Sequence, residues 1–266
     1  MKIFYLLPVC AVLFSCSKKE PAKQIENTAI NTELKHGLPE NYSSIDGLFY
    51  YSFTKTYPYT SPSYMQSFYA SFNDPVKNLM AGFNPYFDYQ MNTKYTGNVA
   101  VGQVLFGNTN LFRTSTGTAL YYYTYNYSGI MPPEISWQTD GNRTFKNIQL
   151  VADSACPLIS NPTPSITTID KSTGISINLA PFASNYDSLI VLILETGNSW
   201  GNSAKKVISN GAPVVFTPND FEYFNSGTNN SMIYYCAYKY YHMVVNNKVL
   251  VFSNGYKINH SVTLVP

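Results

Sequence analysis

The sequence predicts an all-β chain that folds as two tandem antiparallel β-sandwiches, the second of them fibronectin type III-like or immunoglobulin-like. Short apolar or aromatic runs, several with period-2 alternation, are separated by Gly, Pro, Asn, Asp and Ser, as expected for half-buried strands joined by turns. No stretch keeps a 3.6-residue apolar stripe over the length of a core helix. Tyr (24) and Phe (16) are abundant and charged residues make up only 12% of the chain, which suits pleated, half-buried surfaces.

Residues 1–15 are expected to be a lipoprotein signal peptide. Lys2 precedes an uncharged apolar run at 3–14, which is too short to span a hydrocarbon core that needs about 20 helical residues. The run ends in Leu13-Phe14-Ser15-Cys16, which resembles the bacterial lipobox. This resemblance implies that Cys16 is acylated and becomes the new N-terminus. Several acyl chains would then hold the protein firmly on a membrane.

Residues 16–42 are expected to form a flexible tether. Lys, Glu, Asn, Thr and Pro dominate and long apolar runs are absent, so little surface can be buried to offset the entropy cost of ordering. Ser17-Lys18-Lys19-Glu20 is similar to the charged tracts that follow the lipidated Cys in Bacteroidetes surface lipoproteins. The expected location is the outer membrane, facing either the periplasm or the cell surface.

Residues 43–160 are expected to form the first sandwich. The expected strands are 48–54, 65–72, 98–106, 119–127, 135–139 and 144–151. Asp140-Gly141 indicates a turn between the last two, because Asp-Gly is a strong hairpin signal. Trp137 lies at the centre of its strand and is expected in the core.

Residues 161–266 are expected to form the second sandwich, after a break that contains Pro157, Pro162 and Pro164. The expected strands are 166–169, 175–179, 188–195, 205–208, 212–216, 231–243, 248–253 and 256–265, with a short helical turn at 218–221. Asn246-Asn247 and Asn254-Gly255 are both interpreted as hairpin turns. The sequence leaves open whether the two sandwiches are separate domains or one continuous large sandwich.

The cysteines predict no metal site. Cys10 lies in the signal and Cys16 in the lipobox, which leaves Cys156 and Cys236. An oxidising compartment would permit a disulfide between them, but Cys236 lies in an apolar run where a buried thiol acting as a small hydrophobe is the alternative. No Cys or His pair has metal-ligand spacing, and no cofactor is expected.

The combination of these features resembles a Bacteroidetes two-domain β-sandwich lipoprotein of unknown function. The resemblance depends on the lipobox, on GQVLFGNTNL at 102–111, on SWQTDG at 136–141 and on the fibronectin-like C-terminal part. These patterns are architectural, so they imply a location and a fold and no chemistry.

The pentapeptide GNSWG at 197–201 has the form G-x-S-x-G, but the three His residues show no supporting pattern for a serine hydrolase. The sequence contains no P-loop, dinucleotide fingerprint, zinc signature or calcium loop, and we expect a non-enzymatic protein. Lys and Arg number 17 against 15 Asp and Glu. This near balance gives no electrostatic reason to expect nucleic acid as a partner.

Aromatic residues in polar loops are the candidate binding residues. They are Tyr57, Tyr59 and Tyr64 in a Pro- and Ser-rich segment, Tyr86 and Tyr89 in a Pro- and Asn-rich one, and Trp200 between Gly-Asn-Ser repeats. Exposed rings with Asn neighbours can stack on sugars, whereas the alternative is ordinary strand and loop packing. We therefore expect a non-enzymatic envelope protein that binds a glycan. The alternative is a structural or assembly subunit, fimbrillin-like or part of an envelope complex, with envelope proteins as partners.

Overall fold

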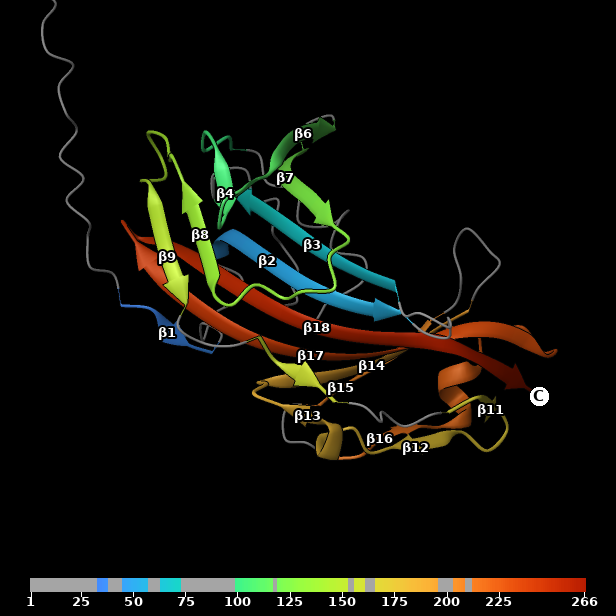
Figure 1. Ribbon diagram of the computed structural model, residues 1–266. Coiled ribbons are helices and arrows are strands. Elements are labelled where there is room, and N and C mark those ends of the chain that lie inside the picture. The colour runs from blue at the N-terminus through green and yellow to red at the C-terminus, as the bar shows by residue number, and fades with distance from the viewer. Residues whose placement is uncertain are drawn as a thin grey trace, which may run out of the picture. The chain divides into compact units, whose positions relative to one another are not determined.

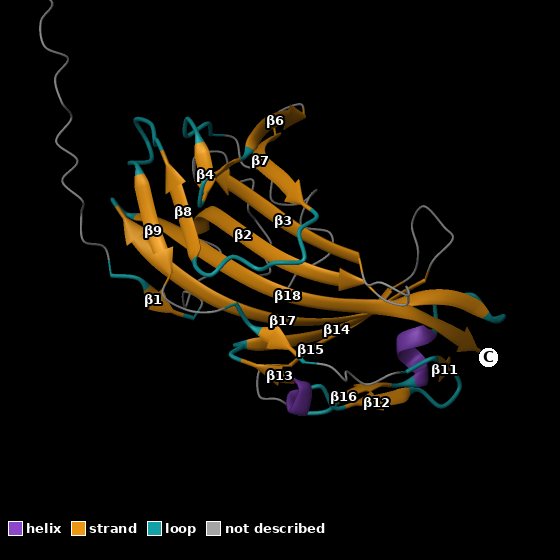
Figure 2. Cartoon of the chain, in the orientation of Figure 1, coloured by secondary structure: helices purple, strands orange, loops and turns teal. Residues whose placement is uncertain are grey.

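Strands make up most of the part of the chain that the computed structural model describes, which is residues 33–37, 45–56, 63–72, 99–116, 119–152, 156–160, 166–195, 203–208 and 212–266. Within these ranges the helical segments are two 3-10 turns, η3 (Ala180–Phe182) and η4 (Pro218–Phe221) (Figure 2). The prediction of an all-β, sandwich-type chain is therefore confirmed, as is the helical turn at 218–221. None of the described segments forms a helix long and apolar enough to cross a bilayer.

Ten of the described strands form one mixed sheet, the main sheet. Its path runs β15 (Ser203–Ile208), β14 (Ser188–Glu195), β17 (Asn229–Val245), β18 (Lys248–Val265), β2 (Ile45–Thr56), β3 (Ser63–Phe72), β7 (Ala119–Asn126) and β6 (Phe112–Thr116). In addition, β1 (Lys35–His36) pairs with β17 and β11 (Thr168–Asp170) pairs with β18. Figure 1 shows β17 and β18 as the longest strands of this sheet.

Three smaller sheets complete the described fold. The second sheet contains β5 (Thr109–Asn110), β4 (Val104–Phe106), β8 (Ile135–Thr139) and β9 (Ile148–Ala152). The two-stranded sheets are β10 (Leu158–Ile159) with β13 (Ala183–Ser184), and β12 (Ile175–Ile177) with β16 (Val214–Phe216).

The hairpin of β17 and β18 turns at Asn246-Asn247, as predicted. These residues have φ values of 50° and 62°, and the register runs from Val245 opposite Lys248 along the whole of β17. A two-residue turn with two positive φ angles matches the twist of its strands, and Asn tolerates that conformation better than most residues.

The second predicted hairpin, at Asn254-Gly255, is wrong because both residues lie inside β18. Gly255 is paired with Tyr238 of β17. A Cβ atom at position 255 would lie 2.6 Å from Cε1 of Tyr238. The glycine therefore lets an aromatic ring of the neighbouring strand lie over the backbone, a usual reason for glycine within a strand.

The connections of the second sheet differ from the expected strands at 98–106 and 144–151. Residues 99–103 are outside β4, since Gly102 has φ +79° and the Val101 N–H donates to Oη of Tyr122 at 2.9 Å. The turn after β8 is longer than Asp140-Gly141 alone. Oδ1 of Asn142 accepts the N–H groups of Thr144 and Phe145, each at 2.7 Å, so β9 begins at Ile148.

The two domains that were expected to meet between residues 160 and 161 share one sheet. β18 pairs in parallel with β2 from Val249 and Ile45 to Asn259 and Thr56, and residues Thr32–Pro266 form one compact unit. The structure thus corresponds to the alternative of one continuous sandwich, with a mixed main sheet in place of purely antiparallel ones. The physical reason is a common core, in which apolar faces from both halves of the sequence are buried together.

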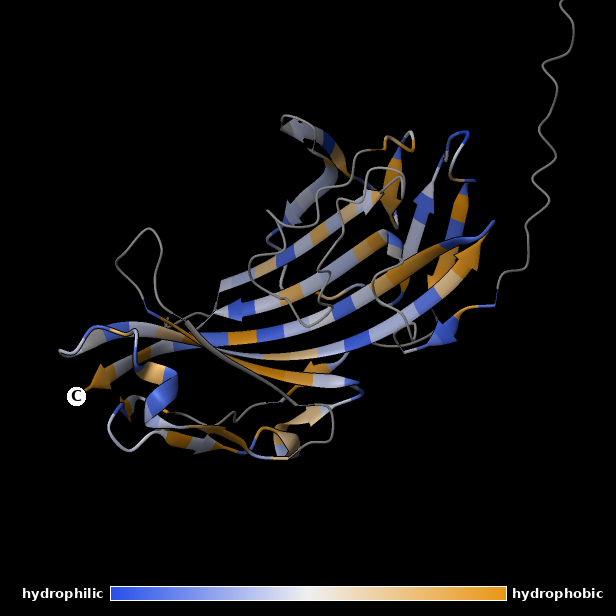
Figure 3. Ribbon diagram, turned by 180° about the vertical axis from the view of Figure 1, so that it is seen from behind, coloured by the Kyte–Doolittle hydropathy of each residue, from blue (hydrophilic) through white to orange (hydrophobic). Residues whose placement is uncertain are grey.

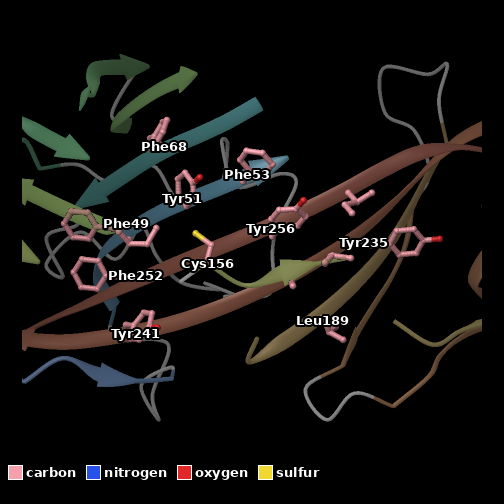
Figure 4. Packing of buried hydrophobic residues seen from close by; sticks show 14 of the residues in the cluster. Phe49, Tyr51, Phe53, Phe68, Cys156, Leu189, Tyr235, Tyr241, Phe252 and Tyr256 are labelled. Carbon is pink, nitrogen blue, oxygen red and sulfur yellow. The ribbon is translucent and has the colours of Figure 1, made fainter. Parts of the chain in front are cut away.

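That core lies between the main sheet and the second sheet. Trp137 of β8 is fully buried, as predicted, with its ring centroid 5.3 Å from that of Phe49 on β2 and 4.9 Å from that of Phe106 on β4. Figure 4 shows this layer, with Phe49, Phe252, Tyr256 and Cys156 pointing into it. The tight aromatic contacts fix how the two sheets face each other.

Cys156 and Cys236 are both buried and no disulfide joins them. Cys156 packs with the core between the sheets, whereas Cys236 belongs to a cluster on the other face of the main sheet. The sheet thus separates the two sulfur atoms. Burial raises the pKa of the Cys156 thiol to about 12, which keeps it protonated and unreactive.

Candidate functional site

The main sheet has a second face, which is rich in tyrosine. Alternate side chains of a strand point to opposite faces, so Phe49, Tyr51 and Phe53 of β2 enter the core while Tyr50 and Ser52 point away from it. Figure 3 shows that apolar and polar residues are mixed along the long strands. We call this side the tyrosine face; it carries Tyr50, Tyr69, Tyr121, Tyr123, Tyr125, Tyr234, Tyr238 and Tyr240.

A pocket of about 640 Å³ opens on this face, and we call it the tyrosine pocket. Its walls come from β2, β3, β17 and β18 and from β7 with Tyr127, which follows it. Tyrosine rings alternate there with small polar groups such as Ser52, Thr54 and Ser67. A pocket of this size that combines apolar ring faces with a few polar groups is a typical small-ligand site.

Two residues that line the pocket each carry a buried oxygen atom with no hydrogen-bond partner among the described residues. These atoms are Oη of Tyr50 and Oδ1 of Asn259, and their side chains belong to residues that are 6% and 5% exposed. Most buried polar atoms in folded proteins are hydrogen-bonded, and an unsatisfied one costs about 1–3 kcal/mol. A ligand hydroxyl would satisfy either atom once its side chain turns toward the pocket, because a hydroxyl can donate to the amide oxygen and exchange a hydrogen bond with the phenol.

Lys257 places a cation beside these groups. Its Nζ lies 5.4 Å from the ring centroid of Tyr50 and 6.0 Å from that of Tyr238. Both distances fit cation–π contacts, which hold the ammonium group against the rings. Lys257 can therefore offer N–H donors at a defined position in the pocket wall.

Burial raises the pKa of the Tyr69 phenol above its usual value, so this phenol is neutral at ordinary pH. The ring of Tyr69 is stacked on that of Tyr121, with centroids 5.6 Å apart and planes at 25°. Such packing holds the ring orientation that a ligand would meet.

Of the predicted binding aromatics, the structure describes Tyr64 alone. Tyr64 borders the pocket, but its ring packs toward the core, with its centroid 5.7 Å from that of Phe53 and its edge against Gly129. The packing alternative thus applies to Tyr64. Tyr57, Tyr59, Tyr86, Tyr89 and Trp200, and the lipidation site Cys16, lie outside the described residues.

Sequence reasoning missed the tyrosines that do line the pocket. Those of β7 carried a visible signal, because Tyr121, Tyr123, Tyr125 and Tyr127 occupy every second position and must share one face of a strand. Tyr50, Tyr234 and Asn259 carried no such signal, since they meet only through long-range strand pairing.

Metal chemistry has no candidate in the described ranges, where no group of three or more His, Cys, Asp or Glu side chains could hold an ion. No known protein family, curated protein or solved structure matches this chain.

Proposed function

We propose that this chain is a lipid-anchored protein of the cell envelope that binds a glycan in the tyrosine pocket and does not convert it chemically. The observation that carries the proposal is a pocket lined by tyrosine rings and by Tyr50 and Asn259, each of which has a buried oxygen without a partner among the described residues. Sugars offer C–H faces that pack on aromatic rings and hydroxyl groups that donate and accept hydrogen bonds. The pocket offers aromatic rings for the C–H faces and polar side chains for the hydroxyl groups.

The anchor and the tether support the envelope location. Acylation at Cys16 would retain the protein on the outer membrane, and residues 16–42 would carry the folded unit away from it. An anchored binding protein needs no affinity for nucleic acid, and its partners would be the membrane and an envelope or environmental glycan. Retention is tested by metabolic labelling with a fatty acid, which should label the wild type and not Cys16→Ala.

The binding proposal is tested with a glycan array and polysaccharide pull-downs on the full-length protein. The wild type should bind at least one class of neutral glycan in a saturable manner. Asn259→Ala removes an acceptor of the pocket and should weaken that binding. Binding that is equally strong in Asn259→Ala would move the site elsewhere, and a folded wild-type protein that binds no glycan would overturn the proposal.

The alternative, an assembly subunit, is favoured by one observation at the end of the sheet path next to β7. β6 ends the described path of the main sheet, and its Phe112 is 66% exposed. Edge strands of this kind can pair with a strand of another chain. Concentration-dependent assembly that Thr114→Pro abolishes would support this alternative, whereas a protein that stays monomeric would exclude it.

A further inference from the structure

Three tyrosines of β7, together with Tyr127 directly after it, form a row of rings along one wall of the pocket. Ring centroids of Tyr121 and Tyr123 are 5.7 Å apart, and those of Tyr123 and Tyr125 are 5.8 Å apart. Tyr127, the next alternate residue, also lines the pocket. We call these four residues the tyrosine row.

Exposure increases along the row. Tyr121 and Tyr123 are half-buried, Tyr125 is 43% exposed and Tyr127 is 75% exposed. The row thus begins against the stacked ring of Tyr69 and ends in solvent. A small ligand at the inner end of the pocket would leave the outer rings unused.

The outer end of the row is held in place by β3. Nε2 of Gln66 donates to the carbonyl oxygens of Ser128 and Ile130, at 3.0 and 2.9 Å. Within the turn, the Ser128 N–H donates to Oδ1 of Asn126 at 2.9 Å. These bonds fix the backbone on the C-terminal side of Tyr127, so a ligand would not have to order that segment on binding.

The rings of the row do not form a flat platform. The planes of Tyr121 and Tyr123 are inclined by 41°, and those of Tyr123 and Tyr125 by 57°. A flat crystalline polysaccharide surface could contact only one such ring with its full face. A single chain whose successive sugar units are rotated relative to one another can place one unit on each ring.

We infer that the tyrosine row binds an extended, soluble glycan chain along this wall of the pocket, with successive sugar units on Tyr123, Tyr125 and Tyr127. This inference rests on the proposed glycan-binding function and specifies its ligand class. The ring spacing from Tyr121 to Tyr125 is close to the length of one pyranose unit in an extended chain, and the row continues to Tyr127 along the pocket wall. Affinity should therefore grow with chain length.

The test is calorimetric titration of the full-length protein with disaccharides and hexasaccharides of the neutral sugar selected on the array. The hexasaccharide should bind the wild type more tightly than the disaccharide by about tenfold or more, where tenfold corresponds to about 1.4 kcal/mol. Tyr127→Ala should remove most of this difference, because it should weaken hexasaccharide binding more than disaccharide binding. Tyr223→Ala is the matched control, because Tyr223 is 79% exposed and lies outside the pocket lining.

Equal affinity for both lengths, or a length dependence that survives in Tyr127→Ala, would overturn the inference while leaving the pocket as a glycan site. Tighter binding to a crystalline polysaccharide than to the soluble hexasaccharide would also overturn it. Loss of both disaccharide and hexasaccharide binding in Asn259→Ala, together with a retained length effect in the wild type, would support the pocket and the row as one site.

Discussion

The ring of Phe49 is stacked on the ring of Phe252, with centroids 4.6 Å apart and planes at 11°. Phe49 lies on β2 and Phe252 on β18, and the two residues are register partners in the parallel pairing of those strands. This contact joins the two halves of the sequence in the core, which makes a single cooperative unfolding unit the expectation.

Phe49→Ala should destabilise the whole unit by about 3–5 kcal/mol, because the ring is fully buried and its removal leaves a cavity. Urea unfolding followed by tyrosine fluorescence and by far-UV circular dichroism should show one shared transition in both proteins. Phe112→Ala is the matched control on an exposed edge strand and should change stability by less than about 0.5 kcal/mol. Two separate transitions, of which only one responds to Phe49→Ala, would indicate independent domains.

Gly255→Ala should destabilise the protein by about 1–3 kcal/mol, since the new methyl group would overlap the ring of Tyr238. That ring is itself buried and stacked near Tyr240, with centroids 6.1 Å apart, so it has little room to move. In a double-mutant cycle the same glycine substitution should cost much less in a Tyr238→Ala background. Equal costs in both backgrounds would show that the glycine is needed for another reason.

His260 should make the protein less stable in mild acid. Burial lowers the pKa of His260, more strongly than the hydrogen bond from the ring to the Ile166 carbonyl raises it. The unfolded chain therefore binds the proton more readily, so stability is full above the unfolded pKa of about 6.5 and is lost as pH falls through it toward the lower folded pKa.

His260→Gln removes this titration, and the variant should lose less stability than the wild type between about pH 7 and about pH 5. Urea unfolding at a series of pH values measures the difference. His36→Gln serves as the control, because His36 is exposed and paired with Asp187 at 3.0 Å. A wild type and a His260→Gln variant with identical pH dependence would contradict the assignment.

Asn259→Ala should leave the free energy of unfolding unchanged or raise it by up to about 1 kcal/mol, although it weakens binding. The substitution removes a buried acceptor that has no partner in the unliganded protein, so it removes a desolvation cost as well as volume. Thermal and urea unfolding measure this. A loss of several kcal/mol would show that Asn259 serves the fold instead of a ligand.

Local structure was largely predictable from the sequence, and long-range pairing was not. The strands at 135–139 and 188–195 were predicted with the bounds that the structure shows, because their alternation and flanking turn residues are local signals. The parallel pairing of β2 with β18 has no local signature, since parallel strands need a long connection. Asn-Gly usually indicates a turn, but this prediction was wrong at Asn254-Gly255. There the glycine makes room for the ring of Tyr238 on the neighbouring strand.

The candidate site was less predictable than the fold. Five segments that are distant in the sequence supply the tyrosine pocket, and only the alternate tyrosines of β7 could have indicated a shared face beforehand. The sequence signal for the predicted aromatics was their Pro-, Ser- and Asn-rich neighbours, which predict exposed rings. The pocket is instead lined by strand residues that lie close together only because distant strands pair in a particular register.

Tyr50→Phe offers the most direct test of the central claim, because it removes one oxygen atom and leaves the ring in place. Calorimetric titration of the selected glycan into both proteins, with urea unfolding of the same samples, measures the effect. The account predicts an affinity lower by about fivefold to tenfold and a free energy of unfolding that is unchanged or higher. Equal affinity in the two proteins, or the absence of saturable glycan binding in the wild type, would contradict it.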